Sequence, residues 1–344
     1  MLLMQTATPT LAPSAVDVTS FLSMPEGHKS LRFAEFYAAM NSMLRFCTCF
    51  LRIHFVVEDD RSGIFASSVT KKLSQHLAVN ISTHVHKLDV TPIVTQKNHR
   101  FGRIALAKAF PDEIFRSNLS KVIIFDIDTL WVSDVCELFK EFNNFNESNA
   151  LGLAPEMGDW YIKFGNQKYH NEYYHIPSDH KNRYKLFDGL NSGIIFADIN
   201  KLASLKWSTT VRAFFQNESK TIILADQDVY NNILFENSHL VYVLPASYNW
   251  QLGSNTIPML GEQNDLLPAV YHGNNYAFTF ENRQICSVWY LFAPDNIRSY
   301  GIGKIVSHIE PKYLNASFRE EALRQFSNRK SRAAFLKAAA GISS

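Results

Sequence analysis

"KVIIFDIDTL", residues 121–130, is the stretch of sequence that decides the fold. The apolar run from Val122 to Phe125 predicts a buried strand. Asp126 and Asp128 follow it, and they share one side of an extended chain because alternate residues of a strand share a face. Two carboxylates that close repel each other unless a cation neutralises them. The pattern predicts a divalent metal at a strand end, with an exposed acidic turn as the alternative.

The composition is that of an ordinary globular protein. Hydrophobic residues make up 46% and charged residues 19%, and the net charge of +2 gives no reason to expect a nucleic-acid partner. No apolar run of about 18 residues occurs, so the sequence predicts no membrane span. The cysteines show neither a disulfide framework nor paired zinc-ligand spacing. We therefore expect buried or free thiols at Cys47, Cys49, Cys136 and Cys286.

Helical and strand patterns alternate along the chain without an internal repeat. Helical spacing covers 33–46, 62–77, 226–237 and the stretch 101–114 up to its proline, Pro111. Strand patterns cover 51–60, 81–90, 121–128, 149–156, the start of 190–202, most of 239–250 and 269–275. This alternation predicts an α/β fold with one mixed, mostly parallel central sheet and helices on both faces.

The two ends of the chain are expected to lie outside this domain. Residues 1–30 are rich in Thr, Ser, Pro and Ala and lack periodicity, which predicts a flexible or irregular leader. The domain itself is expected over 31–310, and the basic stretch 311–344 is expected to form a helical tail.

Polar clusters fall where predicted strands end or helices begin. Ligands of α/β sheets bind beyond the carboxyl ends of the strands, so we expect these clusters to meet there. They are Asp126/Asp128, Asn191/Ser192, Asp226/Gln227 and His272. His272 is a suitable third metal ligand if its imidazole is neutral.

A phosphatase of the haloacid-dehalogenase type is one alternative function. Its nucleophilic aspartate lies in a D-x-D-x-T motif, and Asp126-Ile127-Asp128-Thr129 has that spacing. Against it, the motif lies deep in this chain, and the later lysine and second acidic pair of those enzymes have no convincing match.

Six stretches, spread from about residue 50 to about 295, carry a likeness to a known family. They are FDIDTLWVSDVCELF, ALGLAPEMGDWY, GLNSGIIFADINKLASLKW, LADQDVYNNIL, LVYVLPASYNWQL and VYHGN. Together they resemble glycosyltransferase family 8, whose members are retaining, metal-dependent enzymes of the Rossmann-like GT-A fold. The strongest likeness is to the xylosyltransferase domain of the LARGE-type glycosyltransferases.

The resemblance implies a metal and diphosphate site. Asp126 and Asp128 match the D-x-D that binds manganese and the diphosphate, with Ile127 between them in the donor loop. His272 matches the third metal ligand, and Gly273 lies in the diphosphate loop. The lysine that often follows this histidine is absent here.

The same resemblance implies a site for the donor sugar. Asn191 matches the asparagine that contacts sugar hydroxyls, and Ser192 and Gly193 complete that motif, where glycine lets backbone approach the ligand. Asp226 and Gln227 match the pair that lines the transferring sugar, with the glutamine near the anomeric carbon. These implied catalytic residues are Gln227, Asp226 and Asn191, and Arg103 matches a basic position that some members place against the donor.

The resemblance implies transfer of a sugar from a UDP-sugar to a glycan or glycoprotein acceptor, with retention and with Mn²⁺. Xylose is the first choice for the sugar that is transferred. The alternatives are another family 8 enzyme that uses glucose or galactose, or an inactive member. The last would follow if residues 1–30 lack the first strand, which holds the uracil ring in the family.

A Golgi-lumen location is expected from the family and from five N-x-S/T sequons, while a membrane anchor is absent from this chain. The sequon asparagines are Asn80, Asn118, Asn146, Asn217 and Asn315.

Overall fold

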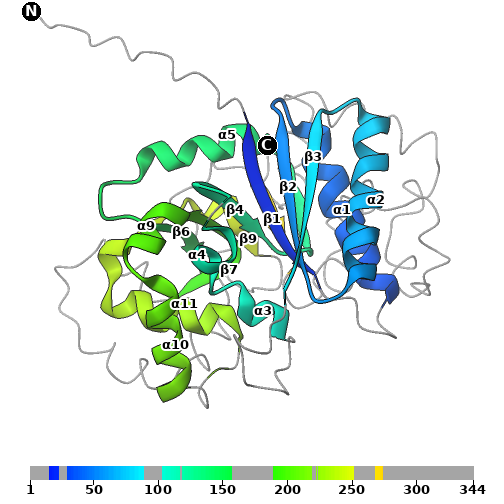
Figure 1. Ribbon diagram of the computed structural model, residues 1–344. Coiled ribbons are helices and arrows are strands. Elements are labelled where there is room, and N and C mark those ends of the chain that lie inside the picture. The colour runs from blue at the N-terminus through cyan, green and yellow to red at the C-terminus, as the bar shows by residue number, and fades with distance from the viewer. Residues whose placement is uncertain are drawn as a thin grey trace, which may run out of the picture.

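The computed structural model describes residues 15–22, 29–88, 103–116, 118–156, 189–218, 222, 224–251 and 268–273. In these parts, a seven-stranded sheet has the order β3-β2-β1-β4-β7-β6-β8 (Figure 1). Its strands are β1 (Val16–Leu22), β2 (Leu51–Val57), β3 (Ile81–Lys87), β4 (Lys121–Phe125), β6 (Leu151–Pro155), β7 (Leu190–Asp198) and β8 (Val241–Val243). Strand β7 is antiparallel to both neighbours, and the other pairs are parallel. The predicted mixed, mostly parallel sheet is confirmed.

A second, three-stranded sheet was not predicted. It has the order β5-β10-β9, with β5 (Thr129–Trp131), β9 (Trp250–Gln251) and β10 (Val270–His272). The strand expected over most of 239–250 is largely wrong, because short 3-10 turns bracket β8. Pro245 lacks an N–H for a ladder and begins the turn η4 (Ala246–Asn249) after it.

Helices cover both faces of the main sheet, as predicted. Figure 1 shows α1 (Lys29–Phe46) and α2 (Asp60–Leu77) together on one side of β1, β2 and β3. The other layer contains α3 (Arg103–Ala107), α4 (Pro111–Phe115), α9 (Ile199–Ser204), α10 (Trp207–Glu218) and α11 (Asp226–Glu236). The helix α5 (Val135–Phe139) and the turns η1 (Lys140–Asn144) and η3 (Ser238–Leu240) complete the described elements.

Strand β4 shows why its apolar run is continuous. Val122 and Ile124 lie in the core under α3, α4 and α9–α11, whereas Ile123 and Phe125 lie in the core under α1. All four side chains are fully buried. A strand that is covered on both faces cannot alternate apolar with polar residues, which explains the sequence pattern.

Local signals set several helix ends. The Asp59 carboxylate accepts from the backbone N–H of Ser62 and caps the start of α2, and Ala78 ends α2 in the left-handed conformation. Asp198 caps α9 by accepting from the N–H of Lys201. The helix expected from residue 101 up to Pro111 is α3, which ends at Ala107, and Pro111 begins a separate helix, α4.

The prediction that residues 1–30 lack the first strand is wrong for Val16–Leu22. Strand β1 lies inside the sheet, pairs with β2 along its whole length and also pairs with β4. Its polar residues interrupt the apolar sequence pattern, and two of them have partners in the sheet: Asp17 accepts two hydrogen bonds from Arg52, of 2.7 and 2.5 Å, and the Ser20 hydroxyl donates to the Phe125 carbonyl. Residues 1–14 and 23–28, like the predicted boundary near 310 and the tail 311–344, lie outside the described residues.

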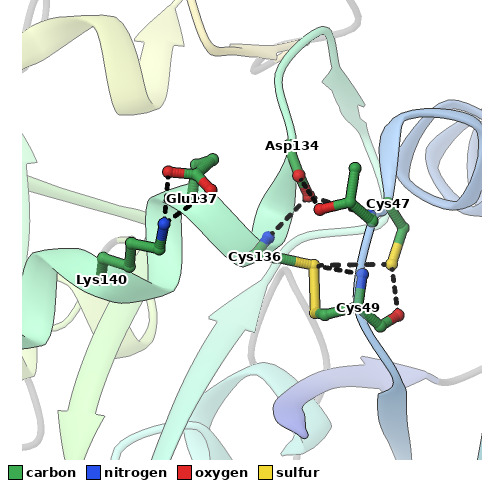
Figure 2. Close-up of a disulfide and its surroundings, with 7 residues drawn as sticks. Cys47, Cys49, Asp134, Cys136, Glu137 and Lys140 are labelled. Carbon is green, nitrogen blue, oxygen red and sulfur yellow. Dashed lines mark hydrogen bonds and ion pairs between the residues drawn. A yellow bond between two sulfur atoms is a disulfide. The ribbon is translucent and has the colours of Figure 1, made fainter. Parts of the chain in front are cut away.

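A disulfide also corrects the sequence prediction. Cys49, just before β2, is bonded to Cys136 in α5, 87 residues away (Figure 2). Helix α1 and strand β5 pack together, with the Trp131 N–H donating to Ser42 Oγ at 3.0 Å, and this brings the two segments into reach. Cys47 stays a thiol, as expected, with its sulfur 3.7 Å from that of Cys136. Cys286 lies outside the described residues.

Candidate active site

The turn after β4 carries the two predicted aspartates. Strand β4 ends at Phe125, and the backbone N–H of Asp126 donates to the carbonyl of Gly193 on β7 at 2.9 Å. Thr129 closes the turn by donating its hydroxyl to the Asp126 carbonyl at 2.8 Å. The carboxylates of Asp126 and Asp128 therefore meet across a turn, and the expectation that they share one face of an extended strand is wrong.

His272 completes a group of three potential metal ligands. One ligand atom from each of Asp126, Asp128 and His272 lies within 4.8 Å of the others. The His272 Nε2 atom is 3.4 Å from Asp128 Oδ1 and 3.7 Å from Asp126 Oδ2. Pairing of β10 with β5 sets His272 opposite Thr129, and the Gly273 N–H donates to the Asp128 carbonyl at 2.7 Å.

The absence of a side chain at Gly193 leaves room for the His272 ring. A Cβ atom on residue 193 would lie 2.3 Å from His272 Cε1 and 2.4 Å from Nδ1, which is closer than atoms can approach. The position therefore requires glycine because an imidazole ring packs on it. The sequence had led us to expect close approach of a ligand instead.

Lys108 is a site residue that sequence reasoning missed. Its ammonium group lies 2.7 Å from Asp126 Oδ1 and 3.0 Å from Asp226 Oδ2, and it donates to the Ser192 carbonyl at 3.0 Å. The side chain is 4% exposed, so the lysine is a buried ion that joins β4, β7 and α11. The sequence holds one indication of a buried lysine here, because Lys108 stands alone within the apolar run IALAKAF. Arg103 begins α3, and its predicted role stays a prediction.

Glu156 is a second missed residue. It follows β6, and its Oε2 atom accepts from Asn191 Nδ2 at 2.9 Å and from Gln227 Nε2 at 2.8 Å. Asn191 Oδ1 in turn accepts from Gly193 N–H at 2.9 Å and from Asn249 Nδ2 at 2.7 Å. The two amide side chains predicted to contact the donor sugar are thus held in fixed orientations by one buried carboxylate.

The backbone before α11 is unusual. Ala225 has φ 55° and ψ −126°, a conformation that costs an L-residue about 1–3 kcal/mol. The Leu224 N–H donates to Asp228 Oδ2 at 2.7 Å and holds this bend. As a result Asp226 and Gln227 form the first turn of α11 and lie at the edge that carries Asp126.

The electrostatics of this edge favour an added cation. Burial, opposed by Lys108 and reinforced by Asp126, raises the pKa of Asp226 to about 6. Burial and the nearby Asp128 raise the pKa of Glu35, on α1, to about 8. Burial would lower the pKa of His272, but Asp128 and Asp126 together raise it. Carboxylates outnumber the lysine here, so a bound divalent ion would relieve their repulsion.

The donor set fits such an ion. Two carboxylates and an imidazole are common ligands of divalent metals. The Nε2 atom of His272 is the ring nitrogen that faces the two carboxylates. An imidazole nitrogen beside two carboxylate oxygens is a donor set that a divalent metal can use.

The comparisons with known proteins agree with this geometry. The model of the family described as "Glycosyl transferase family 8" matches residues 36–268. This chain belongs to glycosyltransferase family 8. The membership leaves the phosphatase alternative without support, because the matched residues 36–268 include Asp126 and Asp128.

Relatives of this family 8 chain include LARGE proteins. It is 34% identical over 157 residues to "Xylosyl- and glucuronyltransferase LARGE2s" of Gallus gallus, a match covering 45% of this chain and 19% of the relative. It is 25% identical over 258 residues to "Glycosyltransferase-like protein LARGE" of Caenorhabditis elegans, covering 71% of this chain and 38% of the relative. The chain thus matches well under half the length of these curated relatives.

Solved structures show the same fold. Mouse xyloside xylosyltransferase 1 superposes with a TM-score of 0.59 at 21% identity, covering 76% of this family 8 chain and 99% of the other. The galactosyltransferase LgtC superposes with a TM-score of 0.53 at 14% identity, covering 85% and 96%. The fold is therefore GT-A, as predicted.

The structure brings most predicted site residues of this family 8 chain to one edge of the sheet. Contacts given above link Asp126, Asp128, Asn191, Ser192, Gly193, Asp226, Gln227, His272 and Gly273. Ile127 lies in the turn between the aspartates, and its side chain packs into the core under α1. Their individual roles are taken up as proposals below.

Proposed function

We propose that this chain transfers a sugar from a UDP-sugar to a hydroxyl of a glycan or glycoprotein, with retention and with Mn²⁺, and that xylose is its preferred donor sugar. The observation that carries the proposal is the meeting of Asp126, Asp128 and His272 with Lys108 and Gln227 at one sheet edge. The names of two similar proteins, a xylosyl- and glucuronyltransferase and a xyloside xylosyltransferase, support xylose.

Asp126, Asp128 and His272 would hold the metal. A divalent ion bound by them would offset the negative charge that develops on the departing diphosphate. The Gly273 amide, already ordered by its bond to the Asp128 carbonyl, lies in the loop that would receive the diphosphate. The sequence has no lysine directly after His272, and the buried Lys108 would act by fixing the orientation of Asp126 and Asp226.

Asn191, Gln227 and Asp226 would bind the transferring sugar. Glu156 accepts from the first two through its shared Oε2 atom, so each of the two amides is held in one orientation. Asp226 is paired with Lys108 and Glu156 with two amides, so neither is free to act as a nucleophile. Attack of the acceptor hydroxyl on the face of the leaving diphosphate, which accepts the hydroxyl proton, is therefore the proposed mechanism.

The alternative of an inactive family member loses its main reason. It rested on a missing first strand, and β1 lies between β2 and β4 with its residues fully paired. We expect UDP with Mn²⁺ to bind with micromolar affinity in calorimetry, and a heat signal only at millimolar concentration would restore the alternative.

A location in the Golgi lumen belongs to this proposal. The Cys49–Cys136 disulfide is typical of an oxidising compartment. Among the described helices, none is long and apolar enough to cross a membrane.

A donor screen tests the function. UDP-xylose, UDP-glucose, UDP-galactose and UDP-glucuronate are supplied separately with Mn²⁺, and release of UDP is measured with and without chelator. We expect the fastest turnover with UDP-xylose, since a pocket closed against the extra hydroxymethyl group rejects hexoses. A preference for UDP-glucose or UDP-galactose would move the chain to the hexose-transferring alternative, and full activity in chelator would overturn the metal site.

A lysine variant tests the arrangement itself. Lys108→Met leaves the partly exposed Asp126 and the buried Asp226 without their cation, so we expect a loss of transfer of roughly 100-fold. Arg212→Met is the matched control, because Arg212 pairs with Glu113 in an exposed salt bridge. Equal rates in the two variants would contradict the assigned role of Lys108.

A further inference from the structure

Three of the five sequons occupy equivalent places in the fold. Asn80 directly precedes β3, Asn118 precedes β4 by two residues, and Asn146 lies in the loop before β6. All three side chains are exposed. Asn217 is exposed too but lies within α10, next to residues outside the described part, and Asn315 is outside it.

Strand directions place these three asparagines at one edge of the sheet. Strands β3, β2, β1 and β4 are parallel, and β6 is parallel to β4 because both are antiparallel to β7. The loops before β3, β4 and β6 therefore all lie at the amino ends. Asp126 follows β4, so about 15 Å of strand separates the edge with Asn118 from the catalytic edge.

Asn146 shows a geometry suited to modification. Its Oδ1 atom accepts three hydrogen bonds of 2.9 Å, from the Ser148 N–H, the Ser148 hydroxyl and the Asn149 N–H. Its backbone carbonyl accepts from Lys201 Nζ at 2.7 Å, so the loop is well fixed. Attachment at Nδ2 keeps every one of these bonds, because all of them use oxygen atoms of Asn146 as acceptors.

We propose that Asn80, Asn118 and Asn146 carry N-linked oligosaccharides, which form a glycan-bearing face at the amino edge of the sheet. The inference rests on the proposed luminal location, for which the Cys49–Cys136 disulfide is independent support. Such acceptor sequences belong to exposed surface: Asn118 and Asn146 lie in exposed loops, and Asn80 is an exposed residue directly before β3.

The modification requires a lipid-diphosphate-linked oligosaccharide as co-reactant. A bond forms between the asparagine Nδ2 and the anomeric carbon of the oligosaccharide, while the bond from that carbon to the diphosphate oxygen breaks. The amide loses one proton, and the lipid diphosphate leaves. No oxidation or reduction is involved.

The placement has a consequence for catalysis. Glycans on these asparagines extend from the edge opposite Asp126 and His272, so they leave access of donor and acceptor unhindered. We expect the same transfer rate, within about twofold, before and after enzymatic removal of the glycans under native conditions.

Glycopeptide mapping of the protein from its own cells tests the proposal. We expect deglycosylation by peptide-N-glycosidase in heavy-oxygen water to convert all three asparagines to labelled aspartate. Unmodified Asn80, Asn118 and Asn146 in protein that carries the Cys49–Cys136 disulfide would overturn it. Glycosylated protein without transferase activity would instead overturn the proposed function and leave this inference intact.

Matched variants of Ser148 check that the acceptor motif is responsible. Ser148→Thr keeps both the motif and a hydroxyl for Asn146 Oδ1, so the electrophoretic shift of one glycan is retained. Ser148→Ala loses that shift. Asn143→Gln, at an exposed asparagine outside any sequon, changes nothing. A shift that survives Ser148→Ala would contradict occupancy of Asn146.

Discussion

Two partly buried charge clusters lie in this sheet, and they are built in opposite ways. The strand cluster consists of Asp17, Arg52, His54 and His86, on the adjacent strands β1, β2 and β3. The edge cluster consists of Lys108, Asp126, Asp128, Asp226 and His272, which come from separate parts of the chain. The first is assembled by strand register, and the second by the convergence of loops and helix ends.

Their ionisation differs accordingly. Burial would raise the pKa of Asp17, but hydrogen bonds from His54 and Arg52 hold it below its usual value. In the edge cluster, burial raises the pKa of Asp226 to about 6 despite Lys108. The strand cluster satisfies its own charges and stabilises the fold, whereas the edge cluster keeps unrelieved negative charge that a ligand cation can neutralise.

The largest expected effect is on the edge cluster. Asp128→Asn removes a carboxylate from the proposed metal site, so transfer should fall roughly 100- to 1000-fold while the folded state is retained. Initial rates with UDP-xylose and Mn²⁺, together with circular dichroism, measure the two effects.

Asp17→Asn is the matched change in the strand cluster. It leaves His54 and Arg52 without their carboxylate, and because Arg52 is partly exposed we expect a loss of only about 1–3 kcal/mol in unfolding free energy. Its transfer rate should stay near that of the parent. If the two variants exchange these phenotypes, the functional distinction between the clusters is wrong.

The next effect concerns the disulfide that links the segment before β2, a strand of the strand cluster, to helix α5, which follows the Asp126–Asp128 turn of the edge cluster. The disulfide joins Cys49, before β2, to Cys136, in the segment that follows the Asp126–Asp128 turn. Cys49→Ser should lower the unfolding free energy by about 2–4 kcal/mol, since a long loop of the unfolded chain is released. Denaturant unfolding measures it.

Cys47→Ser is the control for the disulfide, because this thiol is unpaired and burial raises its pKa to about 11. Its stability should stay within about 0.5 kcal/mol of the parent. An equal loss in both variants would mean that Cys47 shares the cross-link.

A smaller effect is expected from glycine packing. Gly193→Ala forces a methyl group into the His272 ring, so Mn²⁺ affinity should fall along with about 1–3 kcal/mol of stability. Gly152→Ala forces one against the Phe145 ring instead, 2.8 Å away, and should lower stability alone. Calorimetric titration with Mn²⁺ separates the two, and unchanged metal affinity in Gly193→Ala would remove His272 from the metal site.

The smallest effect is on the pH dependence of the free energy of unfolding, to which the two clusters contribute with opposite signs. Burial, with His54 and His84, lowers the pKa of His86 to about 4, so the unfolded chain binds more protons between pH 6.5 and 4. The contribution of His86 to the free energy of unfolding is therefore fully present above pH 6.5 and is lost as the pH falls towards 4. Because His86 is partly exposed, we expect this loss to be only about 1 kcal/mol. His86→Phe should flatten this decline in chelator-treated protein.

Asp226 should act in the opposite direction. Its pKa is raised to about 6, so its ionised form destabilises the native state above that pH, and acidification from pH 6 towards 4 relieves the cost. Asp226→Asn should therefore steepen the acid loss of stability. A flatter curve in that variant would show that Lys108 already compensates the buried charge fully.

Strongly patterned elements were predictable from sequence, and β1 shows where pattern fails. The run 122–125 is apolar because both faces of β4 are covered, and that signal is visible in one sequence. In β1, Asp17, Thr19 and Ser20 interrupt the apolar pattern, although all seven residues are buried. The partners of Asp17 and Ser20 are supplied only by the folded sheet: Arg52 donates to Asp17, and the Phe125 carbonyl accepts from Ser20 Oγ at 3.1 Å.

The site was predictable where neighbouring residues form a motif. Asp126 and Asp128 were recognised together, but Lys108 and Glu156 were missed since each stands alone in the sequence. Lys108 is 118 positions from its partner Asp226, and no local spacing predicts such a pair. The same holds for Cys49 and Cys136, which long-range packing of α1 with β5 brings together.

The interior position of β1 bears on how the chain can be divided for expression. The family match begins at residue 36, and a domain start at residue 31 was expected from the sequence. A fragment cut at either point would lose Val16–Leu22 and so leave β2 and β4 as two unpaired edges facing an empty strand position. Exposed edges of this kind pair with other chains. Fragments that begin after β1 should therefore be recovered as aggregates, whereas those that include residue 15 onward keep the sheet continuous.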